Sequence, residues 1–468
     1  MICAPMVEAL KERRFRGNFL SRLLMLAVLA FATVAQPAMA QSILRDAETE
    51  TLLRDISRPL IEAAGLRPEN VQMVLIHDKS INAFVAGGQI VYLHSGLITA
   101  ADNANEVQGV IAHEVGHITG GHILRFEEGA KIATGIMLLS LVLGAAAMAM
   151  GGGEAGAGIM AAGQHAAMSK FLAFTRTQES SADQAGASFL TRAGVSGKGS
   201  IAFFKKLQNQ EFRLAIPQED SYARTHPLSG ERIQALENVY QGATSWEQKT
   251  DPLLEERFQR VKAKLAGFVQ DPLVTMVRYP ESDKSMPARY ARAYAWHKGA
   301  YPDRADAEVE SLLRDRPRDP FFLELKGQVL LESGRPREAL AALREAVTIA
   351  PNQPLISALF GHALIATEDR ANFDEAKRVL RAAIGRDNSN PFAWYQLGIV
   401  YDREGDTGRA ALATAERYNL ENQPRMALVN ANYALASIPT GSPDWLRAQD
   451  ISMVSRTQVE KEKGKRGK

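Results

Sequence analysis

The sequence predicts two folds in series: an α+β domain that is mostly helical with a small β-sheet, followed by an all-helical repeat solenoid. Three observations carry this prediction. Short strand-like segments occur before residue 95, an H-E-x-x-H motif lies in a helical pattern at residues 113–117, and small residues recur at a near-constant period in the C-terminal half. The 468 residues are enough for two or three domains with their own cores.

The N-terminal forty residues have the features of a secretory signal peptide. A basic region from Lys11 to Arg22 precedes an apolar run from Leu23 to Ala35, and Ala38-Met39-Ala40 is a small-residue cleavage site. An uncleaved anchor is the alternative, but the run is shorter than the ~20 residues that a span needs. We therefore expect cleavage near Ala40, export to the periplasm, and a mature chain that begins at Gln41.

Composition narrows the function classes. The net charge of +2 gives no indication of a nucleic-acid partner. The single cysteine, Cys3, lies in the segment expected to be removed, so we expect neither disulfides nor thiolate chemistry.

Forty residues is long for a signal peptide, so translation could also start at Met6 or later.

The first part of the mature chain combines one helix with a small sheet. Ala47 to Leu66 has apolar residues at helical spacing, and Val71 to His77 alternates like a strand. Ile81 to Val85 and Gln89 to Leu93 flank Gly87-Gly88, which predicts two strands joined by a tight turn.

The next helix carries the clearest chemical signal. It is expected to begin near Asp102 or Asn103, which are both good cap residues. His113 and His117 are four residues apart, so they point the same way from a helix and can hold one zinc ion. Glu114 lies beside them as a candidate proton acceptor.

A catalytic zinc site needs a third protein ligand, and the sequence offers two candidates. His122 follows the motif, but it would have to reach back from the same helix. Glu179 and Asp183 are again four apart, so one carboxylate can bind metal while the other accepts the ring N–H of a ligand histidine. A solvated acidic pair on an exposed helix is the alternative.

A long apolar segment, residues 132–169, separates the histidines from this acidic pair. Ile132 to Gly153 has no charge, and Ala155 to Ala167 is small and apolar. A single membrane crossing would put the two halves of the site on opposite sides of the bilayer, and the second stretch is short for a return. We predict paired apolar helices on one side, either as a flap over the site or as a wedge in the membrane surface. Core packing and an integral membrane protein are the alternatives.

From about Thr250 onward the pattern is helical and repetitive. The tetratricopeptide landmarks recur with spacings of 34 and 37 residues. They are Gly327, Gly361 and Gly398 in the first helices, Ala339, Ala376 and Ala410 in the second, and Trp394, Leu397 and Tyr401 in the best unit. Ala293 and Ala305 mark a weaker copy, and a helix pair from Gln423 to Val454 would follow. Such repeats leave a concave face for protein or peptide partners, whereas a generic helical bundle is the alternative.

The two ligand motifs together resemble the M48 family of zinc metallopeptidases. The resemblance rests on His113-Glu114-Val115-Gly116-His117 and on Arg176-x-x-Glu179-x-x-Ala182-Asp183. Asn82-Ala83-Phe84 is similar to the family's strand that leads into the site, and Thr225-His226-Pro227 to its His-Pro loop. The resemblance implies a zincin-like peptidase domain over residues 41–250, after a signal peptide over 1–40, with the tetratricopeptide repeats over 251–468.

The resemblance also implies roles for these residues. His113, His117 and Glu179 would hold one Zn²⁺ per chain, Glu114 would act as the general base, and Asp183 would orient a ligand histidine. His226 would stabilise the oxyanion or occupy the open zinc position and keep the enzyme latent, unless it is an ordinary loop histidine. Asn82 and Phe84 would present an edge to an extended substrate, unless they form a simple hairpin.

The implied function is a zinc endopeptidase of the cell envelope. Its substrates would be misassembled or unfolded proteins, and the repeats would recruit substrates or the outer-membrane protein assembly machinery. Residues 132–169 would make peripheral membrane contact. The alternative is a chaperone or adaptor for membrane-protein assembly whose peptidase is latent.

Overall fold

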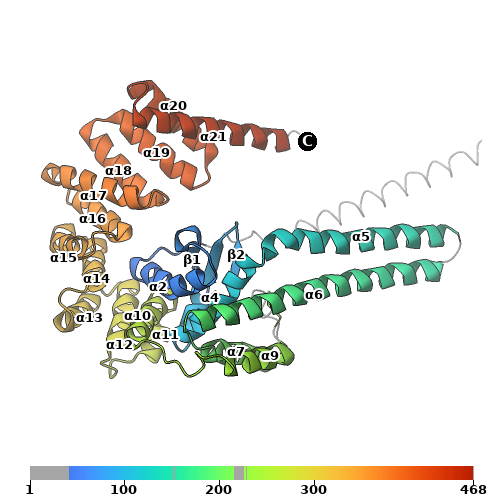
Figure 1. Cartoon of the computed structure of the whole chain (residues 1–468). Coiled ribbons are helices and arrows are strands. Elements are labelled where there is room, and N and C mark those ends of the chain that lie inside the picture. The colour runs from blue at the N-terminus through green and yellow to red at the C-terminus, as the bar shows by residue number, and fades with distance from the viewer. Residues whose placement is uncertain (1–41, 151–152, 215–225, 228, 467–468) are drawn as a thin grey trace, which may run out of the picture. The chain divides into compact units, whose positions relative to one another are not determined.

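The computed structural model describes residues 42–150, 153–214, 226–227 and 229–466. The expected signal peptide and Cys3 lie outside the described residues. The chain is mostly helical, with a three-stranded sheet near its start and a long series of helix pairs in its second half (Figure 1). The fold class expected from the sequence is confirmed.

The small sheet consists of β1 (Gln72–Ile76), β2 (Ala83–Ala86) and β3 (Ile90–His94), in the order β1-β3-β2. β1 runs parallel to β3, whereas β2 and β3 form the expected antiparallel hairpin. Gly87 and Gly88 both have positive φ, +62° and +102°, a conformation that glycine adopts without steric cost. β2 is therefore an edge strand of the sheet.

Helices cover the sheet and build the core of the first part. Their bounds are α2 Ala47–Ala63, α3 Ser95–Ala100, α4 Ala104–Thr119, α7 Lys198–Leu214 and α9 Gly230–Gln241. The helix expected over 47–66 is thus present as α2, where Asp46 caps it by accepting a hydrogen bond from the Thr49 amide at 2.7 Å.

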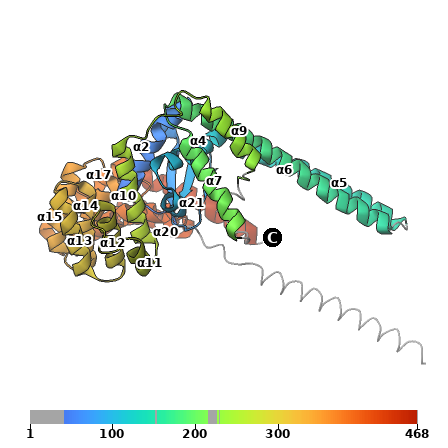
Figure 2. The ribbon, with the colours of Figure 1, turned by 90° about the horizontal axis from the view of Figure 1, so that it is seen from below.

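Helix α4 is the centre of this core. Asn103 caps it by accepting a hydrogen bond from the Glu106 amide, as the sequence predicted. Every residue from Ala104 to His117 is buried, because α2, α6 and α7 pack around the helix. Figure 2 shows α4 beside α2 and α7 from a second direction. A helix buried on all sides holds its side chains in fixed positions.

The apolar segment forms two long antiparallel helices, α5 (His122–Ala149) and α6 (Gly153–Arg192), which lie side by side in Figures 1 and 2. The expected helix pair is confirmed. The alternative of core packing is wrong, because only His122, Gly129 and Gly144 of α5 are buried. The C-terminal part of α6 differs, since its residues from Glu179 to Leu190 include many buried ones that pack against α4 and its neighbours.

Helix pairs make up the rest of the chain. They are α10 Pro252–Val269, α11 Pro272–Arg278, α12 Met286–Lys298, α13 Pro302–Asp315, α14 Pro320–Glu332, α15 Pro336–Ile349, α16 Pro354–Ala366, α17 Phe373–Arg386, α18 Pro391–Glu404, α19 Thr407–Leu420, α20 Pro424–Ser437 and α21 Pro443–Arg466. The three predicted units, the weaker copy and the last pair are all present. The recurring glycine lets two helices approach: Gly327 faces Leu343, and Gly361 faces Leu380.

Helix α10 connects the two halves. Its Phe258, Val261 and Leu265 belong to the same apolar cluster as α2 and α4. The opposite side of α10 packs on α12, where Gly267 approaches the backbone of Ala291. The boundary expected at residue 250 stays a prediction, and the packing shows that α10 contributes to both sides of it.

Candidate metal centre

The helical spacing in α4 brings the two motif histidines together. His113 and His117 lie one turn apart on the same face, with their Nε2 atoms 3.0 Å from each other. On the other side of its ring, Nδ1 of His113 lies 2.9 Å from Asp183 Oδ1. The carboxylate accepts the Nδ1–H, so the Nε2 lone pair of His113 points into the site.

Glu179 enters the site from α6, which crosses α4 at close range. Its carboxylate oxygens lie 3.3 Å from His113 Nε2 and 3.4 Å from His117 Nε2. Asp183 follows one turn later on the same helix face, as the sequence predicted. The structure therefore brings together the five residues His113, Glu114, His117, Glu179 and Asp183.

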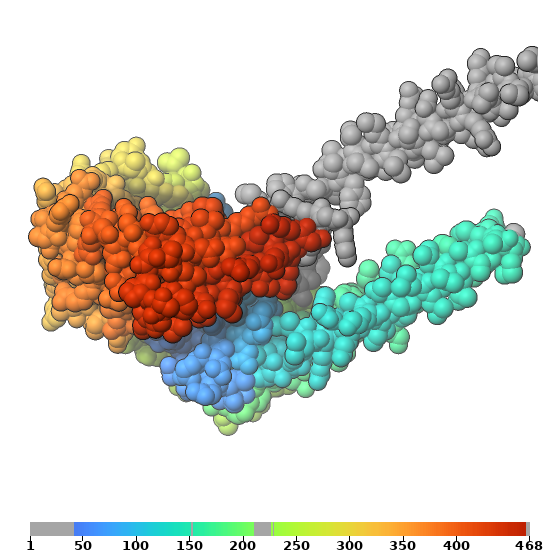
Figure 3. Space-filling model, turned by 90° about the horizontal axis from the view of Figure 1, so that it is seen from above, coloured from blue at the N-terminus to red at the C-terminus, as the bar shows by residue number. Residues whose placement is uncertain are grey.

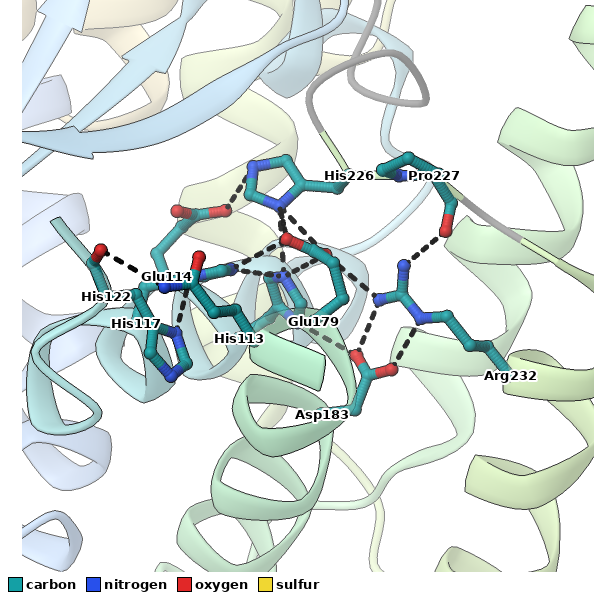
Figure 4. A network of polar contacts seen from close by, with 10 residues as sticks. His113, Glu114, His117, His122, Glu179, Asp183, His226, Pro227 and Arg232 are labelled. Carbon is teal, nitrogen blue, oxygen red and sulfur yellow. Dashed lines mark hydrogen bonds and ion pairs between the residues drawn. The ribbon is translucent and has the colours of Figure 1, made fainter. Parts of the chain in front are cut away.

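His226 completes the cluster from a different part of the chain. Its Nδ1 lies 3.2 Å from His113 Nε2 and 3.1 Å from a Glu179 oxygen. Figure 4 shows the ring above Glu179 and His113, facing the same point. The four candidate ligand atoms of His113, His117, Glu179 and His226 lie within 4.8 Å of one another, and all four residues are buried.

These donors fit a tetrahedral metal ion. The separations of 3.0–3.4 Å between neighbouring donor atoms match the edge of a tetrahedron, which is about 3.3 Å for metal–ligand bonds of about 2.0–2.1 Å. Two ring nitrogens that both present lone pairs repel each other unless a proton or a metal cation lies between them. The donor set is therefore suited to a metal ion.

The charge of the site also favours a cation. Three buried carboxylates, Glu114, Glu179 and Asp183, are accompanied by one guanidinium, that of Arg232. Burial opposes the charged form of His113, but hydrogen bonds with Asp183 and Glu179 outweigh it and raise the pKa of His113 to about 10. Burial opposes ionisation of Glu179 too, yet the surrounding histidines hold its pKa well below the usual range.

Glu114 is buried without a hydrogen bond. Its side chain is fully inaccessible, and among the described residues no hydrogen-bond partner reaches either oxygen. The His226 ring lies close to it, with Nε2 at 3.5 Å from Glu114 Oε1. Leaving a carboxylate buried in this way is costly, which is typical of a catalytic group that meets its partner only when substrate and water are bound.

Arg232, near the start of α9, is a residue that the sequence did not point to. It donates to both oxygens of Asp183, at 2.8 and 2.9 Å, and also to the carbonyl oxygen of Pro227 (Figure 4). One side chain thus ties the residue that orients His113 to the segment that carries His226. Only the fold reveals this, because an arginine in the first turn of a helix has no distinctive sequence pattern.

His122 lies beside the cluster and contacts the second motif histidine. It is not among the four clustered donors. Its Nδ1 lies 2.9 Å from Nδ1 of His117, so it contacts the outer nitrogen of a ligand. Burial, together with the neighbouring His117, lowers the pKa of His122 to about 4, and a neutral ring at this position can accept the N–H of His117.

The two residues proposed for substrate binding lie on or beside the edge strand. Asn82 is buried next to the start of β2. Phe84 is half-buried and stacks on Tyr92, with 5.1 Å between the ring centroids. The ring contacts of Phe84 are with residues of the sheet, and neither residue belongs to the donor cluster. Their role in substrate binding stays a prediction.

A buried His-His-Glu donor set with a further carboxylate beside it, in a mostly helical fold with a small sheet, is typical of a metallopeptidase. Comparison with protein families agrees. Residues 47–240 match peptidase family M48, and residues 301–354 and 366–426 match the tetratricopeptide repeat. The chain thus combines an M48 metallopeptidase domain with C-terminal tetratricopeptide repeats.

Some relatives align with this chain over both its peptidase part and its repeats. The beta-barrel assembly-enhancing protease of Yersinia pestis is 25% identical over 382 residues, which cover 80% of this chain and 76% of that protein. The protein of the same name from Escherichia coli K12 is 24% identical over 378 residues, 79% and 75% of the two chains. A solved tetratricopeptide-repeat protein of Thermus thermophilus aligns with 36% of this chain and 100% of its own, at 19% identity and a TM-score of 0.28.

Proposed function

We propose that this metallopeptidase is a zinc-dependent endopeptidase of the cell envelope that hydrolyses misassembled or unfolded proteins. The observation that carries the proposal is the pairing of a complete His113, His117 and Glu179 donor set with the buried carboxylate of Glu114, which has no hydrogen-bond partner among the described residues. A bound zinc ion would polarise the scissile carbonyl and promote ionisation of a water molecule. The donor set, two histidines and one carboxylate, is one that hydrolytic zinc sites use.

Within this mechanism, Glu114 transfers the proton, and Asp183 and Arg232 position a metal ligand. Glu114 accepts the proton of the attacking water on a carboxylate oxygen and passes it to the nitrogen of the leaving amine. Asp183 keeps the Nδ1–H of His113 engaged, which holds the ring in the orientation that presents Nε2. Arg232 holds Asp183 through two hydrogen bonds.

We also propose that His226 occupies the fourth ligand position in the conformation seen here. Its Nδ1 is as close to His113 Nε2 as the other donors are to one another. In that position it would exclude water and substrate, which corresponds to a resting enzyme. Stabilising the oxyanion is the other role considered for His226, and it would require the ring to move away from Glu179.

The cellular role is proposed from the relatives and the repeats. Relatives named beta-barrel assembly-enhancing proteases align over most of the chain, and repeat solenoids commonly bind proteins. We propose a periplasmic enzyme whose substrates include outer-membrane proteins and whose repeats recruit substrates or the assembly machinery. A chaperone or adaptor with a latent peptidase is the second candidate, favoured by the position of His226.

Replacing Glu114 by glutamine tests the proposal. Glu114→Gln keeps the size of the side chain but cannot accept a proton, so we expect cleavage of unfolded casein to fall about 10²- to 10⁴-fold while zinc content is unchanged. Zinc content is measured by mass spectrometry, with Glu179→Ala as the variant expected to lose the metal.

The same Glu114→Gln variant separates the two candidate functions in cells. If it restores a deletion strain as well as the unaltered protein does, proteolysis is not the biological role, and the chaperone or adaptor function replaces it.

A further inference from the structure

The α5–α6 hairpin exposes an unusually apolar surface. Five side chains near the middle of α5 are each 51–64% exposed, namely Leu138, Leu139, Leu141, Val142 and Leu143. Of the described helices, α5 alone is long and apolar enough to cross a membrane, and only 6% of its most apolar window is buried. Figure 3 shows α5 along its length with no other described segment over it on that face.

The apolar surface surrounds α5 instead of forming a stripe. Successive helix positions point about 100° apart, so the five exposed residues cover every side of α5 except the one against α6. A protein groove covers one face of a helix, and an amphipathic helix in a membrane surface also has one apolar face. A medium that encloses the helix, such as the acyl chains of lipids, covers all of these sides of α5 together.

The two helices are held together by contacts of small residues. A Cβ atom at Gly144 would lie 2.7 Å from the carbonyl oxygen of Gly156, and one at Gly163 would lie 2.0 Å from Ser140 Cβ. Ser140 donates to the Met137 carbonyl of its own helix, so its hydroxyl needs no water. Close packing of this kind joins helices where the surroundings are as apolar as the interface.

Charged residues mark both ends of the apolar part. Between Lys131 on α5, Glu154 at the hairpin tip and Lys170 on α6, the described residues include no Asp, Glu, Lys or Arg, and the α6 arm exposes the polar side chains of Gln164 and His165. Gly163 lies beside Ser140 and Gly129 beside Phe174, and this register places Lys131 and Lys170 at nearly the same level. Between the lysines and the tip each helix is about 26–28 Å long, close to the ~30 Å hydrocarbon core of a bilayer.

We propose that the α5–α6 hairpin inserts into a lipid bilayer up to the level of Lys131 and Lys170. The two ammonium groups would then lie among the lipid phosphates, where long lysine side chains can also extend outward along the helix. Arg125 and Arg176 lie further from the tip and add positive charge on the same side, beside Glu127 and Glu128. Because both ends of the hairpin emerge on that side, the metal ligands on α4 and α6 stay on one side of the bilayer.

Insertion has a consequence for the substrate, which rests on the proposed function. Helix α6 runs without a break from Lys170 to Glu179, a distance of about 14 Å along its axis. The metal centre would therefore lie within about 14 Å of the headgroup level. The substrates best placed for cleavage are peptide segments that emerge from, or lie along, the membrane surface.

Fluorescent labels on the hairpin test the proposal directly. The chain after Cys3 contains no cysteine, so Leu141→Cys on α5 and Ile159→Cys on α6 each give a single site for an environment-sensitive nitrobenzoxadiazole label. Val277→Cys on α11, 84% exposed, is the control. With vesicles of phosphatidylethanolamine and phosphatidylglycerol, we expect brominated acyl chains to quench the first two labels and not the third. The Glu114→Gln background prevents self-cleavage.

Charge substitution provides the second arm. Leu138→Glu with Val142→Glu places two charges on exposed α5 positions, so the fold and zinc content should be retained while flotation with vesicles is lost. The matched pair Val274→Glu with Val277→Glu, on exposed α11 positions, should float like the unaltered chain. Cleavage of casein without vesicles should be the same for both charge variants, which keep Glu114, as for the unaltered chain.

Three results would overturn the proposal. The first is aqueous-type fluorescence at Leu141→Cys and Ile159→Cys, and the second is undiminished flotation of the charged hairpin variant. The third is an unaltered chain that forms an oligomer and does not bind vesicles, combined with a charged hairpin variant that is monomeric. The last result would show that the hairpin binds a second copy of the chain and not lipid. Failure of the proposed function has a different signature, equal cleavage by Glu114→Gln and the unaltered chain, and it leaves flotation unaffected.

Discussion

At the scale of single residues, the metal centre depends on side chains that do not touch the metal position. Asp183 receives the Nδ1–H of His113 and is itself held by Arg232, which also binds the Pro227 carbonyl. Asp183, Arg232 and the His226-Pro227 segment are therefore mechanically linked. A change at one of them should alter how well the ligands are aligned.

Asp183→Asn tests this alignment. The amide keeps the shape of Asp183 but loses the charge that pairs with Arg232 and the acceptor strength that orients His113. We expect zinc affinity to fall about 10- to 100-fold, measured by competition with a chromogenic chelator. Asp369→Asn, on an exposed loop of the repeats, is the control. Unchanged affinity would mean that His113 does not need Asp183.

His226→Ala distinguishes the two roles of this histidine. If His226 is a fourth ligand in a resting state, its removal should speed the loss of zinc to a chelator and increase cleavage of unfolded casein. A slower reaction with normal zinc retention would instead assign the ring to the oxyanion. His297→Ala, at a surface histidine that pairs with Glu332, serves as the control.

At the scale of elements, the crossing of α4 and α6 sets the geometry of the site. Gly116, inside the H-E-x-x-H motif, faces the backbone of Ala182, and Gly186 faces the backbone of Ala112. The two helices can approach this closely only because neither glycine has a Cβ. The approach brings Glu179 of α6 within 3.4 Å of both motif histidines.

Gly116→Ala should therefore disturb the metal centre without changing any ligand. The added Cβ would lie 2.6 Å from the Ala182 carbonyl oxygen, so α6 must move and carry Glu179 and Asp183 with it. We expect zinc affinity to fall at least about tenfold, which is the lower end of the range for changes in residues that support metal ligands. Gly158→Ala is the matched control on α6, because nothing lies within 4 Å of its added Cβ. It should be neutral or stabilise by up to about 1 kcal/mol. Equal affinity in both variants would show that the crossing tolerates a methyl group.

At the scale of the whole molecule, a buried charge cluster joins the peptidase part to the repeats. Arg260 of α10 lies 2.8 Å from Glu48 of α2 and 2.7 Å from Asp319 at the start of α14. Lys264, one turn along α10, pairs with Asp46. Removing one member would leave another charge buried without its partner, which typically costs about 3–5 kcal/mol.

Glu324 of α14 makes this junction sensitive to pH. Burial raises the pKa of Glu324 from its usual 4.5 to about 8, an effect that Lys264 opposes and that Asp46, Glu48 and Glu50 increase. Above about pH 5 the unfolded chain has released the proton of Glu324, whereas the folded chain still holds it. The contribution of Glu324 to the free energy of unfolding is therefore lost as the pH rises from about 5 to 8.

We therefore expect the free energy of unfolding to decrease between about pH 6 and pH 8.5, and Glu324→Gln to reduce this decrease because an amide does not ionise. Thermal unfolding of the zinc-loaded protein at the two pH values measures the effect, with the exposed Glu345→Gln as the control. An identical pH dependence in all three proteins would contradict the assignment to Glu324.

Local pattern was sufficient for much of the fold and for the core of the site. Helical spacing placed His113 with His117 and Glu179 with Asp183, and the repeat period located the helix pairs from α12 to α21. Asn103 as a cap and Gly87-Gly88 as a turn were also predictable, because each depends on the conformation of a few neighbouring residues. The sequence could therefore determine which residues share a face, and it named a donor set whose members the fold brings together.

Only the tertiary structure decided how distant segments meet. Arg232 reaches Asp183, and His122 reaches the outer nitrogen of His117, through helix packing that no local pattern records. The exposure of α5 was also undecided in the sequence, since an apolar helix can fill a core or stand outside one. The physical reason is the same in each case: spacing along the chain fixes the direction of a side chain, whereas its partner depends on which elements pack together.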